Sequence, residues 1–355
     1  MISLVKISLA ICSYNRYEKL KVLLEVLKKQ IENSAFAAKT IGSSFELIIV
    51  DNNSADETKS LKDFSIKDNE YKYLVEMKPG LSAARNKALR EFTGDLICFL
   101  DDDVIVQPNF IASLLKISKR PLVEIGIIGA RVKLPKELKE SNFLKKYRFI
   151  SPSVFPEHDY GSFAKKYPFQ EQAKFMENPI GACFLMSRDV VDSLSMFNEN
   201  IGVGAKKFGE TLHEDTEFFR RAMNQGISLE YSPELCVEHP LDDDRLDTRR
   251  IYNWYFNSGK SFVLLAKHKP EIFAKKNQAE LIGVPYALLK FWPSFLNFEF
   301  LEIPFYMHFK LVVVYFLSVL VHLTMQESWV IFYKAQFFKT MGEIAGFRLV
   351  KLVET

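Results

Sequence analysis

The stretch Gly94-Asp95-Leu96-Ile97-Cys98-Phe99-Leu100-Asp101-Asp102-Asp103-Val104 decides the fold class, because an apolar run ends abruptly in three carboxylates. A continuous apolar run bounded by turn residues is typical of a strand buried on both faces, and α/β proteins place their sites at the open ends of such strands. Three like charges repel one another there, so a hard divalent cation is the usual reason to keep them together. A solvated acidic turn is the alternative. The buried strand before the acids favours the metal site.

The residues before this strand repeat the pattern of an apolar run followed by a helical segment. Apolar runs at 7–12, 45–50 and 71–77 alternate with segments whose apolar residues recur at helical spacing, as at Leu20, Leu24 and Leu27. This alternation predicts parallel strands with right-handed crossovers, which brings the loops after the strands to one edge. That edge should gather Ser13, Tyr14, Asn15, Asp51 and the acids Asp101, Asp102 and Asp103.

Composition indicates a folded chain and excludes several classes of protein. The 355 residues are 48% hydrophobic and 26% charged, which is typical of a globular protein with a sizeable core. The net charge of +3 is too small to indicate nucleic-acid binding. The four cysteines form no C-x-x-C pair, as expected of reduced residues in a cytoplasmic protein. The N-terminus lacks the basic leader of a signal peptide and predicts a first strand instead.

Other site types are disfavoured by missing motif positions. No G-x-G-x-x-G follows the first strand, and the segment Ser258-Gly259-Lys260-Ser261 lacks the upstream glycine of a phosphate loop. A haloacid-dehalogenase-like phosphatase would use Asp101 and Asp103 as its D-x-D motif. That motif normally opens the domain, and Ile105 stands where such enzymes have Thr or Val, so we rank this class second. A catalytically idle, membrane-associated binding protein is a third hypothesis.

Four segments in this order resemble family 2 glycosyltransferases of the GT-A fold: Ser13-Tyr14-Asn15, Val50-Asp51-Asn52-Asn53-Ser54, Ala84-Arg85-Asn86 and Phe99-Leu100-Asp101-Asp102-Asp103. The resemblance implies a Rossmann-like α/β fold, with a mixed sheet flanked by helices and a C-terminal helical extension. It also implies an inverting transfer of a sugar from a UDP-, GDP- or dTDP-sugar to an acceptor hydroxyl.

The resemblance also assigns donor-binding roles. Ser13, Tyr14, Asn15 and Asp51 would hold the base and ribose, Arg85 the nucleotide, and Asp101, Asp102 and Asp103 the sugar nucleotide and its metal-bound diphosphate. Carboxylate-bound Mg²⁺ or Mn²⁺ can neutralise the charge of a diphosphate leaving group. Each assignment has a structural alternative: Tyr14 packs, Asn15 caps the following helix, and Arg85 is an exposed helical charge.

The second half of the chain carries the candidate base and a further metal ligand. Glu214 and Asp215 lead a helical segment, where the helix dipole alone could favour them by about 0.3–1 kcal/mol each. The resemblance makes Asp215 the general base and Glu214 an acceptor-positioning residue. His239 follows a strand-like run and could complete the metal site with Asp103, although a lone His is more often simply hydrogen-bonded.

The predicted domains are a GT-A catalytic domain at 1–245 and a helical, aromatic-rich tail at 246–355. Within the first, about 1–110 would bind the nucleotide sugar and 111–245 the acceptor. The longest uncharged apolar run, 311–325, is shorter than the roughly 20 residues that span a bilayer. Aromatics interleaved with lysines suit helices on an anionic membrane surface, at the inner face of the cytoplasmic membrane. A packed helical subdomain is the alternative. A membrane setting would fit a glycan or lipid-linked acceptor in cell-surface polysaccharide or glycolipid assembly.

Overall fold

The computed structural model describes residues 5–142, 157–159, 179–241, 247–268, 299–300, 303–304, 312 and 336–345. The chain forms two compact units. The first consists of Met1–Pro135, Phe155–Lys207 and Glu214–Pro240, and the second of Lys136–Val154, Phe208–His213 and Leu241–Thr355. The predicted division of function at residue 245 stays a prediction.

The described part of the first unit is built on an eight-stranded mixed sheet with the order β3-β2-β1-β4-β7-β6-β8-β5. The strands are β1 Val5–Ser13, β2 Ser43–Asp51, β3 Glu70–Val75, β4 Leu96–Asp101, β5 Ile105–Val106, β6 Ile127–Lys133, β7 Cys183–Ser187 and β8 Leu229–Glu238. β3, β2, β1 and β4 are parallel, which confirms the predicted parallel arrangement of these strands. β7 runs antiparallel to both β4 and β6, so the sheet is mixed, as predicted.

The central strands are apolar because both faces of the sheet are covered. All of β4 from Leu96 to Leu100 is buried. The register pairs Ser13 with Asp51 across β1 and β2, and Cys12 with Asp101 across β1 and β4. The carboxyl ends of three parallel strands therefore meet at one edge, where the acids follow β4.

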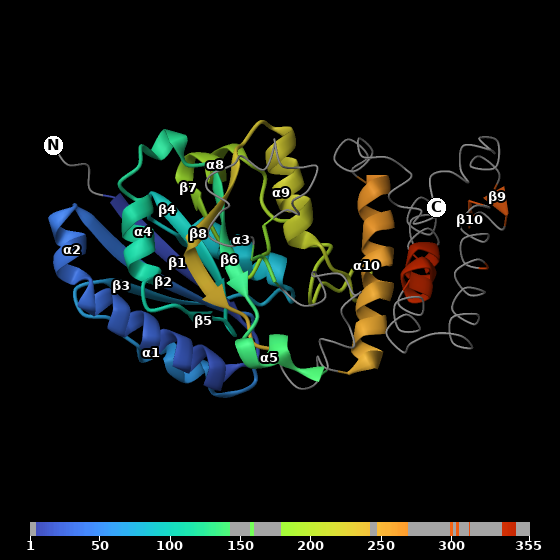
Figure 1. Ribbon diagram of the computed structural model, residues 1–355, viewed down its shortest axis with the longest axis horizontal. Helices are drawn as coiled ribbons and strands as arrows, with labels where there is room; N and C mark the ends of the chain where they lie inside the picture. Colours follow the sequence, from blue (N-terminus) through green and yellow to red (C-terminus); the bar gives the residue numbers. More distant parts are fainter. Residues whose placement is uncertain are drawn as a thin grey trace. The chain divides into compact units, whose positions relative to one another are not determined.

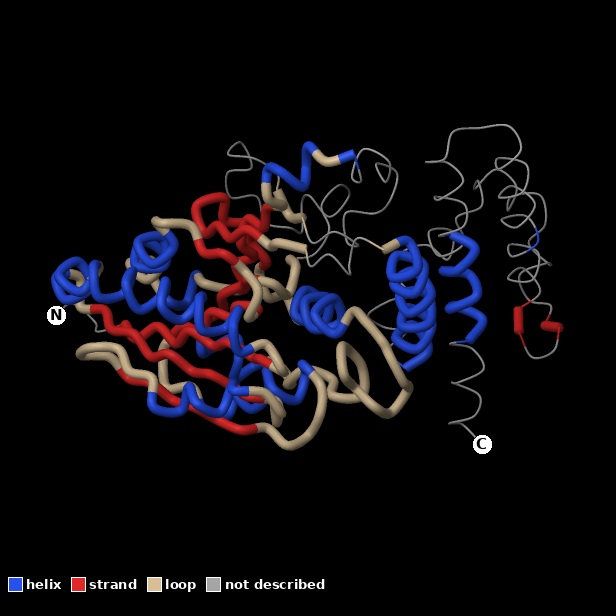
Figure 2. Tube along the Cα trace, turned by 90° about the horizontal axis from the view of Figure 1, so that it is seen from below, coloured by secondary structure: helices blue, strands red, loops and turns tan. Residues whose placement is uncertain are grey.

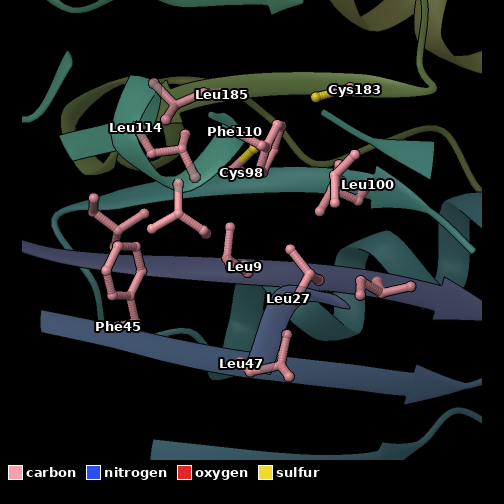
Figure 3. Close-up of a cluster of buried hydrophobic side chains, with 14 of the residues drawn as sticks. Leu9, Leu27, Phe45, Leu47, Cys98, Leu100, Phe110, Leu114, Cys183 and Leu185 are labelled. Atoms are coloured by element: carbon pink, nitrogen blue, oxygen red, sulfur yellow. The ribbon is translucent and has the colours of Figure 1, made fainter. Parts of the chain in front are cut away.

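Helices cover both faces of this sheet (Figures 1 and 2). One core joins the sheet to α1 Tyr17–Asn33 and α4 Phe110–Ile117, and the other joins it to α3 Leu81–Glu91 and α9 Glu214–Asn224. Shorter helical elements of this unit are α2 Ala35–Thr40, η1 Glu57–Asp63, η2 Leu122–Glu124 and α8 Arg188–Ser193. In the first core Leu9, Leu47 and Leu100 of three neighbouring strands point toward Leu27 of α1 and Phe110 of α4 (Figure 3).

The second unit contains α5 Lys136–Glu140, α10 Thr248–His268, the strands β9 Glu299–Phe300 and β10 Ile303–Pro304, and helical residues 336–345. Tyr252 of α10 stacks on Phe338 with 4.9 Å between ring centroids. Residues 258–261 lie within α10, so they form no phosphate loop.

Within this unit, α10 holds the segment Phe208–His213 through three side chains. The Asn257 amide donates to Glu210 at 3.0 Å, and the Ser261 hydroxyl accepts from the Leu212 amide at 2.8 Å. Ser258 Oγ lies 2.8 Å from His213 Nε2. The residue that follows this segment in the chain is Glu214.

In the described part of the chain no helix combines the length and the hydropathy needed to cross a bilayer. The apolar run 311–325 lies outside the described residues except for Val312. The membrane-surface hypothesis for the tail therefore stays a prediction.

Candidate active site

The loops after β1 and β2 are fastened to each other by the residues of the first two motifs. Asp51 is fully buried, and its carboxylate accepts hydrogen bonds from the Tyr73 hydroxyl at 2.6 Å and the Ser54 amide at 2.8 Å. Ser54 Oγ in turn accepts from the Asn15 amide at 2.9 Å. Asp51 thus shapes the loop that follows it. Burial, followed by the hydrogen bond to Asp51, raises the pKa of Tyr73.

The alternative that Asn15 caps the following helix is wrong. Asn15 has a φ of 53°, and its side-chain oxygen accepts from the Ala55 amide at 2.7 Å instead. No side chain caps α1 at its N-cap residue Arg16, and the Tyr17 amide donates to Asp56 at 2.9 Å. The left-handed backbone of Asn15 turns its side chain toward the loop after β2, away from the helix.

Tyr14 is 59% exposed at the same edge, which contradicts the alternative that it packs in the core. An exposed aromatic ring offers a flat apolar face. It is therefore available to a ligand at the carboxyl end of β1.

Arg85 lies at the centre of the site, and the alternative of an exposed helical charge is wrong. Its side chain is 3% exposed. The guanidinium lies 3.2 Å from Glu214 Oε1 and 3.5 Å from Asp101 Oδ1, and it donates to the Gly181 carbonyl at 3.1 Å. It also packs over the Phe184 ring, 5.9 Å from the centroid. One cation therefore joins the acids after β4 to the acids that begin α9.

The three consecutive acids at the end of β4 each contact a different residue, in addition to the Arg16 that Asp102 and Asp103 share. Asp101 contacts Arg85, while Asp102 accepts from the Ser13 hydroxyl at 2.7 Å. Asp103 Oδ1 lies 3.4 Å from His239 Nε2. Burial raises the pKa of Asp102 to about 6, although Arg16 and Ser13 oppose that rise. The protonation of Asp102 therefore responds to changes in nearby charge.

Asp101, Asp103 and His239 form a candidate metal group in the described part of the chain. Each offers one ligand atom, and these atoms lie within 4.8 Å of one another. His239 Nδ1 lies 2.9 Å from the Pro240 carbonyl and donates to it, which leaves Nε2 facing Asp103. Two carboxylates and an imidazole fit Mn²⁺ or Mg²⁺. The structure groups Asp101 with Asp103 and His239, whereas the sequence placed it with the donor-binding residues.

Glu214 and Asp215 begin α9 in different environments. Glu214 is buried, and burial raises its pKa to about 7, with the Asp215 charge adding to the rise and Arg85 opposing it. Asp215 is half-buried, and its Oδ2 accepts from the Gly181 amide at 2.9 Å. Gly181 thus contacts Asp215 through its amide and Arg85 through its carbonyl. A side chain at that position would meet both.

Several residues that shape the site were missed from the sequence. Asn52 holds the loop after β3, donating to the Lys78 carbonyl at 2.7 Å and accepting from the Gly80 amide at 2.8 Å. Asn86 exchanges two hydrogen bonds with the backbone of Phe197. Both stand beside a predicted site residue within a motif, and that adjacency is the only sequence signal they carry.

The amino-acid sequence from residue 8 to residue 195 matches the family described as "Glycosyl transferase family 2". The match includes Ser13, Asp51, Arg85 and the acids after β4, whereas α9 and His239 lie beyond it.

Two curated relatives illustrate the similarity. A putative glycosyltransferase, EpsH, of Bacillus subtilis is 28% identical over 111 residues, covering 31% of this chain and 29% of that protein. The glucosyl-dolichyl phosphate glucuronosyltransferase of Haloferax volcanii is 23% identical over 245 residues, covering 68% of this chain and 71% of that protein.

A solved structure shares the fold. It is the mannosyltransferase PcManGT from Pyrobaculum calidifontis, in complex with GDP-Man and Mn²⁺, with 14% identity, a TM-score of 0.53, and coverage of 96% of this chain and 88% of that one. The mixed sheet flanked by helices is thus the GT-A fold. Because the family match covers more than half of the sequence, this chain belongs to glycosyltransferase family 2.

Proposed function

We propose that this glycosyltransferase moves a sugar, with inversion, from a nucleotide-diphosphate donor to an acceptor hydroxyl, and that it depends on a divalent cation. The observation that carries the proposal is the pair of contacts of Arg85. Its guanidinium reaches Asp101 of the candidate metal group and Glu214 beside Asp215. An inverting displacement needs the base and the leaving group on opposite sides of one reacting carbon. A single side chain spanning the two acidic groups supports that arrangement.

In the proposed reaction Asp215 takes the proton of the acceptor hydroxyl. The hydroxyl oxygen forms a bond to the anomeric carbon as the bond from that carbon to the diphosphate oxygen breaks. The Gly181 amide holds one oxygen of Asp215, which orients the carboxylate. Glu214 positions the acceptor beside it. A Mg²⁺ or Mn²⁺ ion held by Asp101, Asp103 and His239 would neutralise charge on the departing diphosphate.

The donor side is proposed at the carboxyl ends of β1, β2 and β4. Tyr14 would stack on the base, Ser13 and Asp102 would meet the ribose, and Asn15 and Asp51 would keep the two loops in shape for the nucleoside. The donor is a UDP-, GDP- or dTDP-sugar. Because the Pyrobaculum enzyme was solved with GDP-Man, that sugar nucleotide is one of the first to test.

The acceptor is proposed to be a glycan or a lipid-linked sugar in cell-surface polysaccharide or glycolipid assembly. The name of the Haloferax relative includes a dolichyl phosphate carrier, which supports a lipid-linked acceptor. We place residues 1–245 in catalysis and 246–355 at an anionic membrane surface, with the protein at the inner face of the cytoplasmic membrane.

A ligand screen followed by a transfer assay tests the proposal. Purified chain is melted with UDP, GDP or dTDP, with and without Mn²⁺ or Mg²⁺, because a ligand that binds only the folded state raises its melting temperature. We expect one nucleotide to stabilise the protein in a metal-dependent way. That effect should disappear in Asp103→Asn and persist in Asp192→Asn, an exposed matched control on α8.

The matching nucleotide sugar, together with a lipid-linked sugar as the acceptor, is then given to the wild type and to Asp215→Asn. We expect the Asp215 variant to bind the nucleotide and metal normally but to lose transfer, and we expect NMR of the product to show an inverted anomeric centre. Retention of configuration would contradict the mechanism. Normal transfer by Asp215→Asn would contradict the assignment of the base, and no transfer by either protein would favour the idle binding protein.

A further inference from the structure

Arg16 takes part in the acidic cluster although neither the motif roles nor the proposed reaction uses it. It directly follows Ser13-Tyr14-Asn15 and stands at the start of α1. Its Nη1 donates to Asp102 Oδ1 at 2.9 Å and to Asp103 Oδ2 at 2.6 Å. The Arg16 side chain is 34% exposed, whereas those of Asp102 and Asp103 are only 7% and 3% exposed. A partly solvated cation thus pairs with two buried carboxylates.

This cation is not needed to build the helix that carries it. The Arg16 side chain makes no capping hydrogen bond to α1, and the Tyr17 amide is bonded by Asp56. Asp102 also keeps its hydrogen bond from Ser13. The Arg16 side chain therefore contacts the acids and does not cap the helix.

Arg16 contacts one of the three candidate metal ligands directly. Asp103 is shared: its Oδ2 accepts from Arg16, and its Oδ1 lies nearest His239. A divalent cation held by Asp101, Asp103 and His239 would be separated from the Arg16 guanidinium only by the carboxylate of Asp103. Two positive charges at that separation repel each other where the surroundings are partly desolvated.

A nucleoside diphosphate reverses this balance. Its phosphates bring negative charge to the same edge of the sheet, so a metal ion that arrives with them adds little or no net positive charge. The repulsion from Arg16 is then offset, and the guanidinium faces anions on both sides.

Resting on the proposed function, we infer that Arg16 couples the binding of the divalent cation to the binding of the nucleotide diphosphate. It disfavours the metal alone and favours the metal together with the nucleotide. By linkage, it must strengthen nucleotide binding in the presence of metal by the same factor.

The experiment measures Mn²⁺ affinity, so it does not depend on transfer activity. Free Mn²⁺ is followed by electron paramagnetic resonance, with and without UDP, GDP or dTDP, for the wild type and for Arg16→Gln. We expect Arg16→Gln to bind Mn²⁺ alone roughly tenfold more tightly than the wild type, the order expected when a neighbouring unit charge is removed. The enhancement of Mn²⁺ affinity by the nucleotide should fall by a similar factor.

Two further variants separate charge from structure. Arg120→Gln removes an arginine that pairs with Glu230 at 2.9 Å within the same unit, and it should leave Mn²⁺ affinity unchanged. Arg16→Lys keeps the positive charge and should keep most of the coupling. If Arg16→Gln does not fold, Arg16→Met provides the neutral variant.

The outcomes distinguish this inference from the proposed function. If the wild type binds Mn²⁺ more tightly with nucleotide and the neutral variant behaves the same, or binds Mn²⁺ alone more weakly, the role of Arg16 is overturned and the proposed function stands. If the wild type binds neither Mn²⁺ nor any nucleotide, the proposed function fails, and the inference fails with it.

Discussion

Arg85 is the single residue on which the geometry of the site depends most. Lysine would keep its charge, but one ammonium cannot replace a planar fork that reaches Glu214, Asp101 and the Gly181 carbonyl together. We expect Arg85→Lys to lower the turnover number roughly 100-fold, the scale of a misplaced catalytic group. Steady-state kinetics with the identified donor would measure this.

The matched comparison is Arg85→Met, which removes the charge altogether. At pH 8, where Glu214 is charged in the wild type, leaving it buried without its cation should cost about 3–5 kcal/mol of unfolding free energy. Arg85→Lys should cost less, because the charge stays. Equal turnover of Arg85→Lys and the wild type would contradict the positioning role.

The raised pKa of Glu214 predicts that the stability of the fold depends on pH. Burial raises its pKa from 4.5 to about 7, so the folded state holds this proton more tightly than the unfolded chain does. Its stabilising contribution is complete below pH 4.5 and is lost as the pH rises through about 7. Glu214→Gln mimics the protonated form. The free energy of unfolding of the variant should equal that of the wild type at low pH. At pH 8 it should exceed the wild-type value by about 3 kcal/mol for a pKa shift of this size. Urea unfolding from pH 4.5 to 8 measures the difference.

Glu199→Gln is a control of opposite sign. Burial alone would raise the pKa of Glu199, but hydrogen bonds from Asn86 and Lys78 lower it. That carboxylate therefore stabilises the fold above its ordinary pKa of 4.5, and the contribution is lost as the pH falls. The free energy of unfolding of Glu199→Gln should be lower than that of the wild type at pH 8. This difference should become smaller toward low pH. A gain for this variant would contradict the pKa assignment.

At the scale of the elements, α9 is placed by a loop that comes close to its first residue. Gly202 has a φ of 105°, and a Cβ there would lie 2.9 Å from the Glu214 side chain. Gly226, beyond the other end of α9, has a φ of 81° and nothing within 4 Å of such a Cβ. Both Gly→Ala changes should cost about 1–2 kcal/mol through the left-handed backbone. Only Gly202→Ala should also lower transfer, because it displaces Glu214.

Thermal melting and transfer assays on the two alanine variants test this pair. Equal loss of activity in both would show that general destabilisation is responsible. Loss confined to Gly202→Ala would assign the effect to the contact with Glu214.

The elements could be predicted from the sequence where a local pattern determines them. The apolar runs of β1, β2 and β4 and the leucine spacing of α1 are of this kind. Ser54 shows where local patterns fail. Its capping-box spacing to Glu57 predicts a helix that starts at Ser54. The N-cap of η1 is instead Asp56, which accepts from the Thr58 amide.

The acidic residues of the candidate site could be predicted from the sequence better than the contacts of its arginines. Asp103 and His239 follow strands, and the structure places them within reach of each other, whereas the position of Asp101 beside them was not predicted. The contact of Arg85 with Glu214 joins residues 129 positions apart, and that of Arg16 with Asp103 joins residues 87 apart. No local spacing encodes such contacts, because they depend on how α1, α3 and α9 pack around the end of β4.

At the scale of the whole molecule, the second unit can affect the proposed site because its segment Phe208–His213 leads directly into Glu214. Its helix α10 holds Glu210, Leu212 and His213, and the next residue is Glu214. Replacing Asn257, Ser258 and Ser261 together by alanine should lower transfer roughly tenfold. The segment that precedes α9 would then lose the hydrogen bonds that hold it. Nucleotide and metal affinity should stay unchanged. Asn253→Ala, exposed on the same helix, is the control.

Transfer and Mn²⁺-affinity measurements on the triple variant decide this prediction. Wild-type turnover in the triple variant would show that α9 is positioned by the first unit alone. A joint loss of turnover and metal binding would instead indicate a general failure of the fold.

The interleaving of the two units also has a consequence for how the protein is made. The residues proposed for donor, metal and base are all synthesised by Pro240, yet the hydrogen bonds to the segment before Glu214 come from residues 45 to 49 positions further along. Since domains generally fold as units during synthesis, the sheet can form while that segment still lacks its partners. A nascent chain released before α10 would then carry every proposed catalytic group and still have only the lowered activity expected of the triple variant. The order of emergence from the ribosome would thereby delay full activity until the second unit has begun to fold.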